Sequence, residues 1–349
     1  GNNIGNLIGF KDVKDFVTSI KKPRNIIVIA KDRKDIDGVI NELVGLLDSN
    51  DLIIDGSNDW YKNSQSRSDE LLNKQILYIG MGIIDAEFGT RKGATLMIGG
   101  DINGYKRAEP ILSKIAVKDD DSNSSVGYIG TGGCSSYVSM VYNGIEYTEM
   151  ELIAEAYDIL KNIIGLSNAE ISGVFKEWNK GELSSKLIEI TSKIFETKDD
   201  RGSNDEYLID KILDKIEQNN ADSWIINDAV TQGIAVPTIY GALNARFISF
   251  YKKERIEFES FIKLNKQKPN NNINKKAIID DIGKALFASK VCLYTQAFNL
   301  IQKANVTNKW NINVIDIISI LNVGSIIKGP LLDRITKVYK KNPKLKSLL

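Results

Sequence analysis

The sequence contains no histidine. This absence excludes a Ser-His-Asp triad, a His-ligated zinc site and an imidazole general base. Cysteine is also scarce, because only Cys134 and Cys292 are present and they lie far apart along the chain. This usage predicts no disulfide framework and fits the cytoplasm or another reducing intracellular compartment. Acid–base chemistry in this chain would therefore depend on Lys, Glu, Asp, Tyr or Ser.

The chain lacks a strong net charge and a long apolar run. Its 46 basic and 45 acidic residues give a formal net charge of +1, so no global field indicates a nucleic acid or an anionic membrane as partner. No apolar run approaches the roughly 20 residues that a membrane helix needs. The opening residues GNNIGNLIGF lack the layout of a signal peptide. The length of 349 residues predicts a folded protein of two or three domains.

Short apolar runs alternate with amphipathic stretches up to about residue 130. The runs are rich in Ile, Val or Leu, flanked by Gly, Asp or Asn, and typical of buried strands. Helical spacing follows each of the first two runs, in DIDGVINELVGLLDSND and SQSRSDELLNKQ. This alternation predicts a parallel α/β sheet covered by helices. The five runs are NIIVIA (25–30), DLIIDG (51–56), ILYIGMG (76–82), TLMIGG (95–100) and VGYIG (126–130).

The sequence from residue 135 to the end predicts helices and no strand. In 135–164, apolar residues recur every three or four positions, so one stripe of a long helix faces a core. The Asn-rich segment 264–276 is predicted to be a loop or linker. We therefore predict an α/β domain over 1–134 and an all-helical domain over 135–349. Further helices are predicted at 168–180, 183–196, 205–218, 223–233, 237–263, 275–304, 312–322 and 325–340.

Several long motifs follow one another in a fixed order. The first half contains KKPRNIIVIAK (21–31), DLIIDGSNDWY (51–61) and GTRKGATLMIGGD (89–101). The second half contains NGIEYTEMELIAEAYDI (143–159), EWNKGELSSKLIEIT (177–191), GALNARFIS (241–249) and GKALFASKVCLYTQAFNLI (283–301). Over nearly its whole length the chain therefore resembles the decarboxylating 6-phosphogluconate dehydrogenase family, and several ordered motifs carry more weight than one short pattern.

This resemblance implies a nicotinamide-type Rossmann domain, an all-helical domain and a homodimer. The implied reaction oxidises 6-phosphogluconate with NADP and then decarboxylates it to ribulose 5-phosphate. By the same resemblance, the family's opening strand, its Gly-rich turn and the arginine for the 2′-phosphate are expected before Gly1. The family's C-terminal tail, which reaches into the partner's active site, is expected after Leu349.

Several elements that carry the family's chemistry are replaced in this chain. The family lysine that acts as base and then as acid corresponds to Ser139, and the nearby histidine corresponds to Tyr142. The family's Ser-Gly-Gly turn corresponds to residues 84–86, Ile-Asp-Ala, and a lysine that holds the substrate phosphate corresponds to Ser223. The Trp-Arg-Gly-Gly-Cys stretch corresponds to 321–325. A serine hydroxyl is a weak base near pH 7 unless another base lies beside it.

Other positions match the family pattern. The resemblance implies one catalytic acid, three substrate contacts and two cofactor contacts. Each has a structural alternative, because a helical glutamate can be a satisfied interface residue and a lone arginine can pair with a nearby carboxylate. The implied catalytic acid is Glu146, the substrate contacts are Asn143, Tyr147 and Arg246, and the cofactor contacts are Asn58 and Lys31.

The combination of replaced chemistry and readable helix-packing motifs leads to three hypotheses. The preferred one is a catalytically inactive member of the family, a structural or interaction module that requires no cofactor. The second is an active NADP-dependent decarboxylating dehydrogenase, with Glu146 and Tyr147 as surviving acid and anchor. The third is a non-catalytic sensor of a nucleotide or sugar phosphate through Arg246 and Asn58. The expected assembly is a homodimer through the helical domain, or a larger protein complex.

Overall fold

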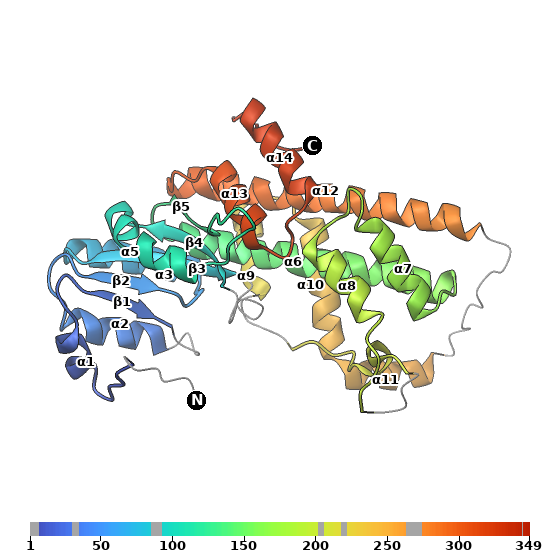
Figure 1. Cartoon of the computed structure of the whole chain (residues 1–349), viewed down its shortest axis with the longest axis horizontal. Coiled ribbons are helices and arrows are strands. Elements are labelled where there is room, and N and C mark those ends of the chain that lie inside the picture. Colours follow the sequence, from blue (N-terminus) through green and yellow to red (C-terminus); the bar gives the residue numbers. More distant parts are fainter. Residues whose placement is uncertain are drawn as a thin grey trace. The chain divides into compact units, whose positions relative to one another are not determined.

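A computed structural model describes residues 7–29, 35–84, 93–201, 206–217, 222–262, 274–343 and 345–349. The chain divides into two compact units (Figure 1). The α/β unit comprises Gly1–Val117, Val126–Ser139 and Lys309–Asn313. The helical unit comprises Lys118–Ser125, Met140–Asn308 and Val314–Leu349.

The α/β unit is built on a five-stranded sheet in which the strand order follows the sequence order. Neighbouring strands are parallel, except that β3 and β4 are antiparallel. Only residues 85–94 join these two strands, and a parallel crossover needs a dozen or more. The sheet is therefore mixed and departs at this pair from the expected parallel arrangement. The strands are β1 (Asn25–Val28), β2 (Leu52–Asp55), β3 (Leu77–Ile84), β4 (Thr95–Gly100) and β5 (Val126–Gly130).

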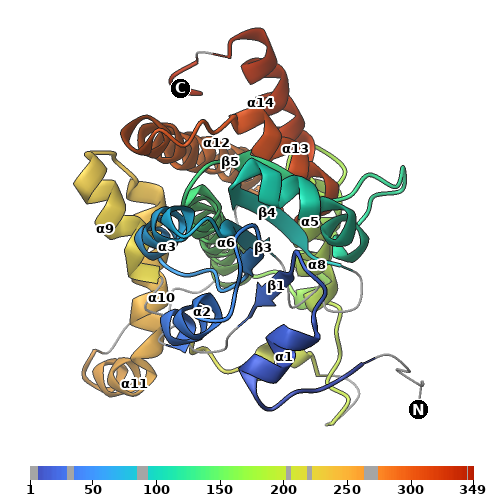
Figure 2. The ribbon, with the colours of Figure 1, turned by 90° about the vertical axis from the view of Figure 1, so that its left-hand side faces the viewer.

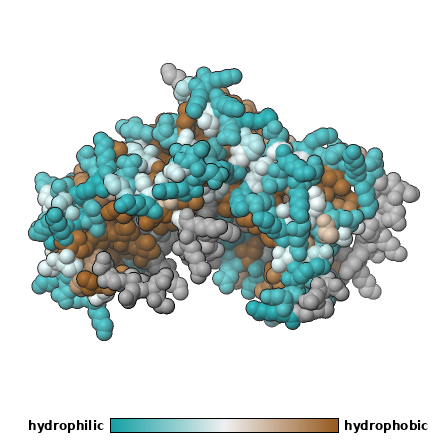
Figure 3. Space-filling view, viewed as in Figure 1, coloured by the Kyte–Doolittle hydropathy of each residue, from teal (hydrophilic) through white to brown (hydrophobic). Residues whose placement is uncertain are grey.

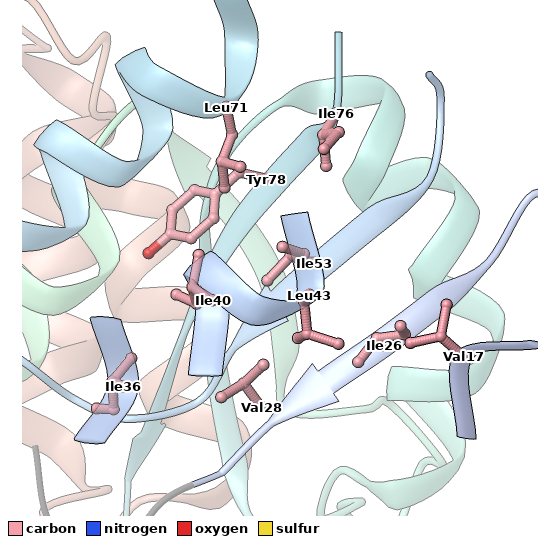
Figure 4. Packing of buried hydrophobic residues seen from close by; sticks show 10 residues of the cluster. All are labelled: Val17, Ile26, Val28, Ile36, Ile40, Leu43, Ile53, Leu71, Ile76 and Tyr78. Carbon is pink, nitrogen blue, oxygen red and sulfur yellow. The ribbon is translucent and has the colours of Figure 1, made fainter. Parts of the chain in front are cut away.

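Helices cover both faces of this sheet (Figure 2). On one face, α1 (Val13–Ser19), α2 (Ile36–Val44) and α3 (Tyr61–Asn73) contribute to one apolar cluster. On the other face, α5 (Ile102–Ile115) packs over a second cluster. The sequence analysis did not predict α1 or α5. Figure 4 shows the first cluster, which consists of Val17, Ile26, Val28, Ile36, Ile40, Leu43, Ile53, Leu71, Ile76 and Tyr78.

Strand β1 forms one edge of the described sheet. Ile27 and Ile29 beside this edge are 40% and 69% exposed, and Figure 3 shows hydrophobic surface in this part of the α/β unit. On β1 itself the burial alternates, because Ile26 and Val28 point into the apolar cluster while Ile27 points outward. The strand therefore buries one face only, as a period of two predicts.

The long helix α6 (Cys134–Asp158) begins directly against the sheet. A Cβ atom on Gly82 of β3 would lie 2.1 Å from Ser139 Oγ, and one on Gly99 of β4 would lie 2.5 Å from Cys134 Sγ. Real Cβ atoms do not approach other heavy atoms this closely. Only glycine therefore allows the first turns of α6 to lie at this distance from the strands.

A segment from far along the sequence completes the α/β unit. Lys309–Asn313 follows the last long helix, yet Trp310 is 1% exposed within this unit. Its ring lies 5.6 Å from that of Tyr61 and 5.2 Å from that of Tyr137, centroid to centroid. Its indole N–H donates a 2.8 Å hydrogen bond to Gln65 Oε1. The aromatic core of the α/β unit thus depends on a residue about 180 positions after the last strand.

The helical unit consists of long helices. As predicted, the described part of 135–349 contains no strand, only an isolated bridge between Lys198 and Tyr207. None of the described helices has the length and apolarity that a membrane crossing requires. After α6, which continues as a π-helical turn at Ile159–Ile163, the helices are α7 (Asn168–Trp178), α8 (Lys186–Ile194), α9 (Asp222–Gln232), α10 (Pro237–Phe250), α11 (Lys252–Phe261), α12 (Lys275–Asn308), α13 (Val314–Gly324) and α14 (Pro330–Lys341).

Two of the predicted helices differ from the structure. The prediction of a helix at 205–218 is wrong, because the described residues there contain only a 3-10 turn at Leu208–Lys211. The bridge of Tyr207 with Lys198 and the ion pair of Lys211 with Asp199, in which Nζ lies 2.6 Å from Oδ2, keep this segment out of a helical conformation. The predicted helix 237–263 is broken into α10 and α11 at Tyr251, whose φ of −83° and ψ of 49° are not helical.

A buried ionic network joins α6 to α12. Lys290 Nζ lies 3.1 Å from Glu149 Oε2, and the Tyr294 hydroxyl donates a 2.7 Å hydrogen bond to Glu149 Oε1. Glu149 is 2% exposed and Lys290 is 4% exposed. Burial, with the Glu149 carboxylate beside it, raises the pKa of Tyr294 well above its usual value, so the hydroxyl remains a donor. Both ends of the carboxylate are satisfied, which fixes the register of the two helices.

We expect Gly82→Ala to destabilise the α/β unit by about 1–3 kcal/mol, because the new methyl overlaps Ser139 Oγ and must push α6 from the sheet. The control is Gly173→Ala in α7, where nothing lies within 4 Å of the added Cβ. There alanine should be neutral or stabilising by up to about 1 kcal/mol.

Thermal unfolding of both variants checks this expectation. Adding Ser139→Ala to Gly82→Ala removes the overlapping hydroxyl and should restore most of the lost stability. A Gly82→Ala protein as stable as the parent chain would contradict the proposed close packing.

Candidate active site

Helix α6 carries four of the residues singled out by the sequence. Ser139, Asn143, Glu146 and Tyr147 are spaced by four, three and one residues, which places them along one side of a helix. Ser139 is 3% exposed, whereas the other three are half-buried. The part of α6 that carries Asn143, Glu146 and Tyr147 is therefore accessible to a ligand.

Ser139 has an unusual environment within the α/β unit. Its Oγ is buried and has no hydrogen-bond partner among the described residues, and the same holds for Ser135 Oγ one turn earlier. Buried hydroxyls are normally paired, and leaving one unpaired costs about 1–3 kcal/mol. Two orphaned hydroxyls therefore lie beside the glycines of β3.

Tyr147 and Arg246, two predicted substrate contacts, lie together in the helical unit. The guanidinium carbon of Arg246 on α10 lies 4.3 Å from the centroid of the Tyr147 ring. A cation over an aromatic face is attracted by the ring quadrupole. Stacking uses the flat face of a guanidinium, whose N–H donors lie in the plane of the group, a geometry that suits phosphate oxygens.

Ser223 lies at the start of α9 and is exposed. Two residues later, Ile225 packs against α6 at Gly144, where a Cβ would lie 2.5 Å from Ile225 Cδ1. Gly144 follows Asn143 directly, so the structure places the start of α9 beside the polar residues of α6. A hydroxyl at position 223 cannot supply the positive charge of the lysine that the resemblance implies there.

Asn58 is held in one orientation at the end of β3. Its Nδ2 donates to the backbone oxygen of Ile83 at 2.9 Å, and the Ile83 N–H donates to its Oδ1 at 3.1 Å. Its φ of 51° is left-handed, a conformation that asparagine tolerates better than most residues. Lys31, the other predicted cofactor contact, lies outside the described residues, as do the second and third residues of the 84–86 turn.

The glycine-rich turn before α6 uses its amides within the protein. Thr131 N donates to the Trp310 backbone oxygen at 2.8 Å, and Gly133 N donates to Gln65 Oε1 at 3.0 Å. Cys134, the next residue, is fully buried, and burial raises the pKa of its thiol far above the usual range. The turn therefore joins parts of the α/β unit, and its thiol is not a reactive nucleophile.

Sequence reasoning missed two buried charged groups near these residues. One is the ion pair of Glu149 on α6 with Lys290 on α12. The other is Arg67 on α3, which is 5% exposed and pairs with carboxylates next to Asn58. The only sequence signal is a charged residue at an otherwise apolar helical position. Among the described residues no group of three or more His, Cys, Asp or Glu side chains could hold a metal ion.

Comparisons with known proteins also divide the sequence into a cofactor-binding part and a helical part. Residues 3–130 match the model of the NAD binding domain of 6-phosphogluconate dehydrogenase, and residues 135–349 match that of its C-terminal domain. The decarboxylating 6-phosphogluconate dehydrogenase 1 of Spinacia oleracea is 44% identical over 346 residues, 98% of this chain and 71% of that protein. The decarboxylating enzyme of Lactococcus lactis is 39% identical over 345 residues, 99% of this chain and 72% of that protein.

Solved structures give the same result. Plasmodium falciparum 6-phosphogluconate dehydrogenase, solved in its apo form and in complexes with NADP+ and with 6-phosphogluconate, superposes with a TM-score of 0.91 at 37% identity. The match covers 98% of this chain and 73% of that one. A 3-hydroxyisobutyrate dehydrogenase of Mycobacterium tuberculosis, at 15% identity and a TM-score of 0.51, shares the fold alone.

These relatives contradict the hypothesis of a catalytically inactive module, which was the preferred one. They are named as decarboxylating dehydrogenases, and the similarity spans nearly the whole chain. The error was to equate a missing lysine with missing catalysis. A general base contributes about 10²–10⁴-fold to a rate, whereas enzymes accelerate reactions by about 10⁶-fold or more. The expectation that no cofactor is required is likewise unsupported, since the first part of the chain matches an NAD-binding domain. Its two halves, its fold and its relatives together place this chain in the 6-phosphogluconate dehydrogenase family.

Proposed function

We propose that this protein is an NADP-dependent enzyme that oxidatively decarboxylates 6-phosphogluconate to ribulose 5-phosphate. One observation carries the proposal: identities of 39–44% to decarboxylating 6-phosphogluconate dehydrogenases extend over 96–99% of this chain. The overall change converts the sugar acid and NADP+ into ribulose 5-phosphate, carbon dioxide and NADPH. A substrate hydroxyl loses its proton, the carbon that bears it loses a hydride to NADP+, and the carboxylate of the resulting keto acid then leaves as carbon dioxide.

Helix α6 supplies the substrate side in this proposal. Glu146 donates the proton that the substrate carbon needs after carbon dioxide has left. Asn143 and Tyr147 bind the sugar acid on the same helix face. Arg246, stacked on the Tyr147 ring at 4.3 Å, binds the substrate phosphate with its in-plane donors. The half-buried position of these residues allows contact with a ligand and partial exclusion of water.

The cofactor side also fits a nicotinamide dinucleotide, which supplies the hydride acceptor when bound. Asn58 uses one donor and one acceptor on Ile83, and an asparagine amide has a further donor and acceptor position available in principle. Ser139 Oγ lies against Gly82, the residue before Ile83. An orphaned hydroxyl and an oriented amide therefore lie against consecutive residues near the carboxyl end of β3, the edge at which α/β sheets bind dinucleotides.

The surrounding assembly is part of the same proposal. We propose a homodimer that forms through the helical unit, in a reducing intracellular compartment where Cys134 and Cys292 remain free thiols. In α11 no residue is buried, and Phe258 and Phe261 are 65% and 82% exposed. An apolar helix face of this kind is typical of a protein–protein contact.

The activity assay tests the proposed reaction. Incubation of the purified chain with 6-phosphogluconate and NADP should form NADPH and carbon dioxide in equal amounts. Glu146→Gln removes the proposed proton donor and should lower kcat by about 10²–10⁴-fold. Folded protein that forms no NADPH in response to 6-phosphogluconate would contradict the proposed function.

A second prediction concerns the base. Because a serine hydroxyl is a weak base, we expect proton removal to limit kcat, and Ser139→Lys to raise kcat by roughly 10²-fold or more. Burial lowers the pKa of a lysine, so part of it is a neutral amine near pH 7. Ser139→Arg is the control of similar size, since arginine stays protonated. Equal kcat values for two folded variants would contradict a proton-transfer role for this position.

Light scattering tests the dimer. We expect twice the mass of the chain, and expect Phe258→Glu combined with Phe261→Glu to give monomers, because burying two carboxylates in an apolar contact is costly. Leu72→Glu, at a residue of the α/β unit that is 68% exposed, should leave the dimer intact. A dimer that survives the double substitution would show that α11 is not the contact.

A further inference from the structure

Arg67 on α3 binds three aspartates with three different nitrogen atoms. Its Nε lies 2.7 Å from Asp37 Oδ1, its Nη1 lies 3.1 Å from Asp55 Oδ2, and its Nη2 lies 2.7 Å from Asp59 Oδ2. Arg67, Asp55 and Asp59 are 5%, 3% and 5% exposed. Removing either buried aspartate would leave the Arg67 charge uncompensated and is strongly destabilising, so this part of the arrangement has little freedom.

The two buried aspartates have further donors. Asp55 Oδ2 accepts a 2.8 Å hydrogen bond from the Tyr78 hydroxyl, and Asp59 Oδ1 accepts a 2.7 Å bond from the Trp60 N–H. Burial, with the Asp55 carboxylate beside it, raises the pKa of Tyr78 well above its usual value and keeps the hydroxyl a donor. The Tyr78 ring belongs to the apolar cluster drawn in Figure 4. The network is thereby anchored in the core of the unit.

The three aspartates come from the ends of secondary-structure elements at one edge of the sheet. Asp37 lies in the first turn of α2, the helix after β1. Asp55 is the last residue of β2, and Asp59 lies just before α3. The Arg67 guanidinium therefore bridges the segments that follow β1 and β2. Asn58 lies between Asp55 and Asp59, so its backbone is held from both sides.

A groove of about 320 Å³ separates α2 from α3 beside this network, and Asp37, Asn41, Asn63, Arg67 and Lys74 are among its lining residues. The Arg67–Asp37 ion pair joins α3 to α2 beside this groove. The Asp37 side chain is 65% exposed, and exposed ion pairs contribute little to stability. We therefore expect the Arg67–Asp37 ion pair to position α2 and to contribute little to the free energy of unfolding.

We propose that Arg67 is a positioning residue of the nucleotide site, which holds the start of α2 and the 55–59 loop in the arrangement that binds the cofactor. This inference depends on the proposed function, because it assumes that NADP binds at this edge of the sheet. Arg67 and Asp37 act through α2 and Asn58 and do not themselves contact the cofactor. Pre-arranged loops bind more tightly because less ordering is left to binding.

Asp37→Ala, which cuts the exposed arm of the network, tests the proposal. We expect the dissociation constant and the KM for NADP to rise by about fivefold, while the melting temperature stays within error of the parent chain. A loss of folded protein would instead lower kcat and leave KM unchanged, so the change in KM identifies positioning. Arg67→Lys, which cannot reach three carboxylates at once, should raise KM further.

Asp35→Ala is the matched control. Asp35 has the same charge at the same end of α2, is exposed, and makes no side-chain cap hydrogen bond. Removing an acidic group near an anionic cofactor should strengthen binding by electrostatics alone. Weaker binding by Asp37→Ala and equal or tighter binding by Asp35→Ala therefore separate positioning from charge.

Equilibrium binding of NADP, followed by cofactor fluorescence or calorimetry, distinguishes two failures. If the parent chain binds NADP and Asp37→Ala binds it equally well, the positioning role is wrong and the proposed function stands. If the folded parent chain binds no NADP, the proposed function is wrong, and the positioning role falls with it.

Discussion

The close approach of α6 to the sheet is the constraint on which the rest of the α/β unit depends. Glycines at positions 82 and 99 remove the side chains that would hold the helix away from β3 and β4. The small residues Cys134 and Ser139 complete the contact. This geometry buries the Ser139 hydroxyl beside the strand end where Ile83 binds the Asn58 amide. A packing requirement thereby fixes the position of the Ser139 hydroxyl relative to the end of β3.

Each unit contains one buried ionic network, and the two networks differ in what they join. Glu149 and Lys290 link two long helices, so this network selects the register of α6 against α12. Arg67 instead joins connections after strands, which have little apolar packing of their own. Such connections carry ligand contacts in α/β proteins because a rigid sheet positions them. Each network thus fixes the arrangement of elements within its own unit.

The sequence predicted the fold class, all five strands and most long helices, because buried strands and amphipathic helices have clear apolar periods. It missed α5, whose run INGYKRAEPILSKI is polar and contains Pro110 within the helix. It also misjudged 205–218, where the pairing of Lys211 with Asp199 overrides helical spacing. The contacts of Arg67 could not be predicted, since they join residues 8 to 30 positions apart through the fold. The stacking of Arg246 on Tyr147 could not be predicted either, because these residues are also distant in sequence.

The Trp310 segment has a consequence for how the chain is made. The first sheet of the protein is synthesised early, yet the ring that fills the space between Tyr61 and Tyr137 arrives about 180 residues after the last strand. During translation the α/β unit must therefore wait, without the Trp310 ring in its aromatic core, until residue 310 has left the ribosome. A chain interrupted before residue 310 would lack this ring, and quality-control proteases would meet an α/β unit with an incomplete core.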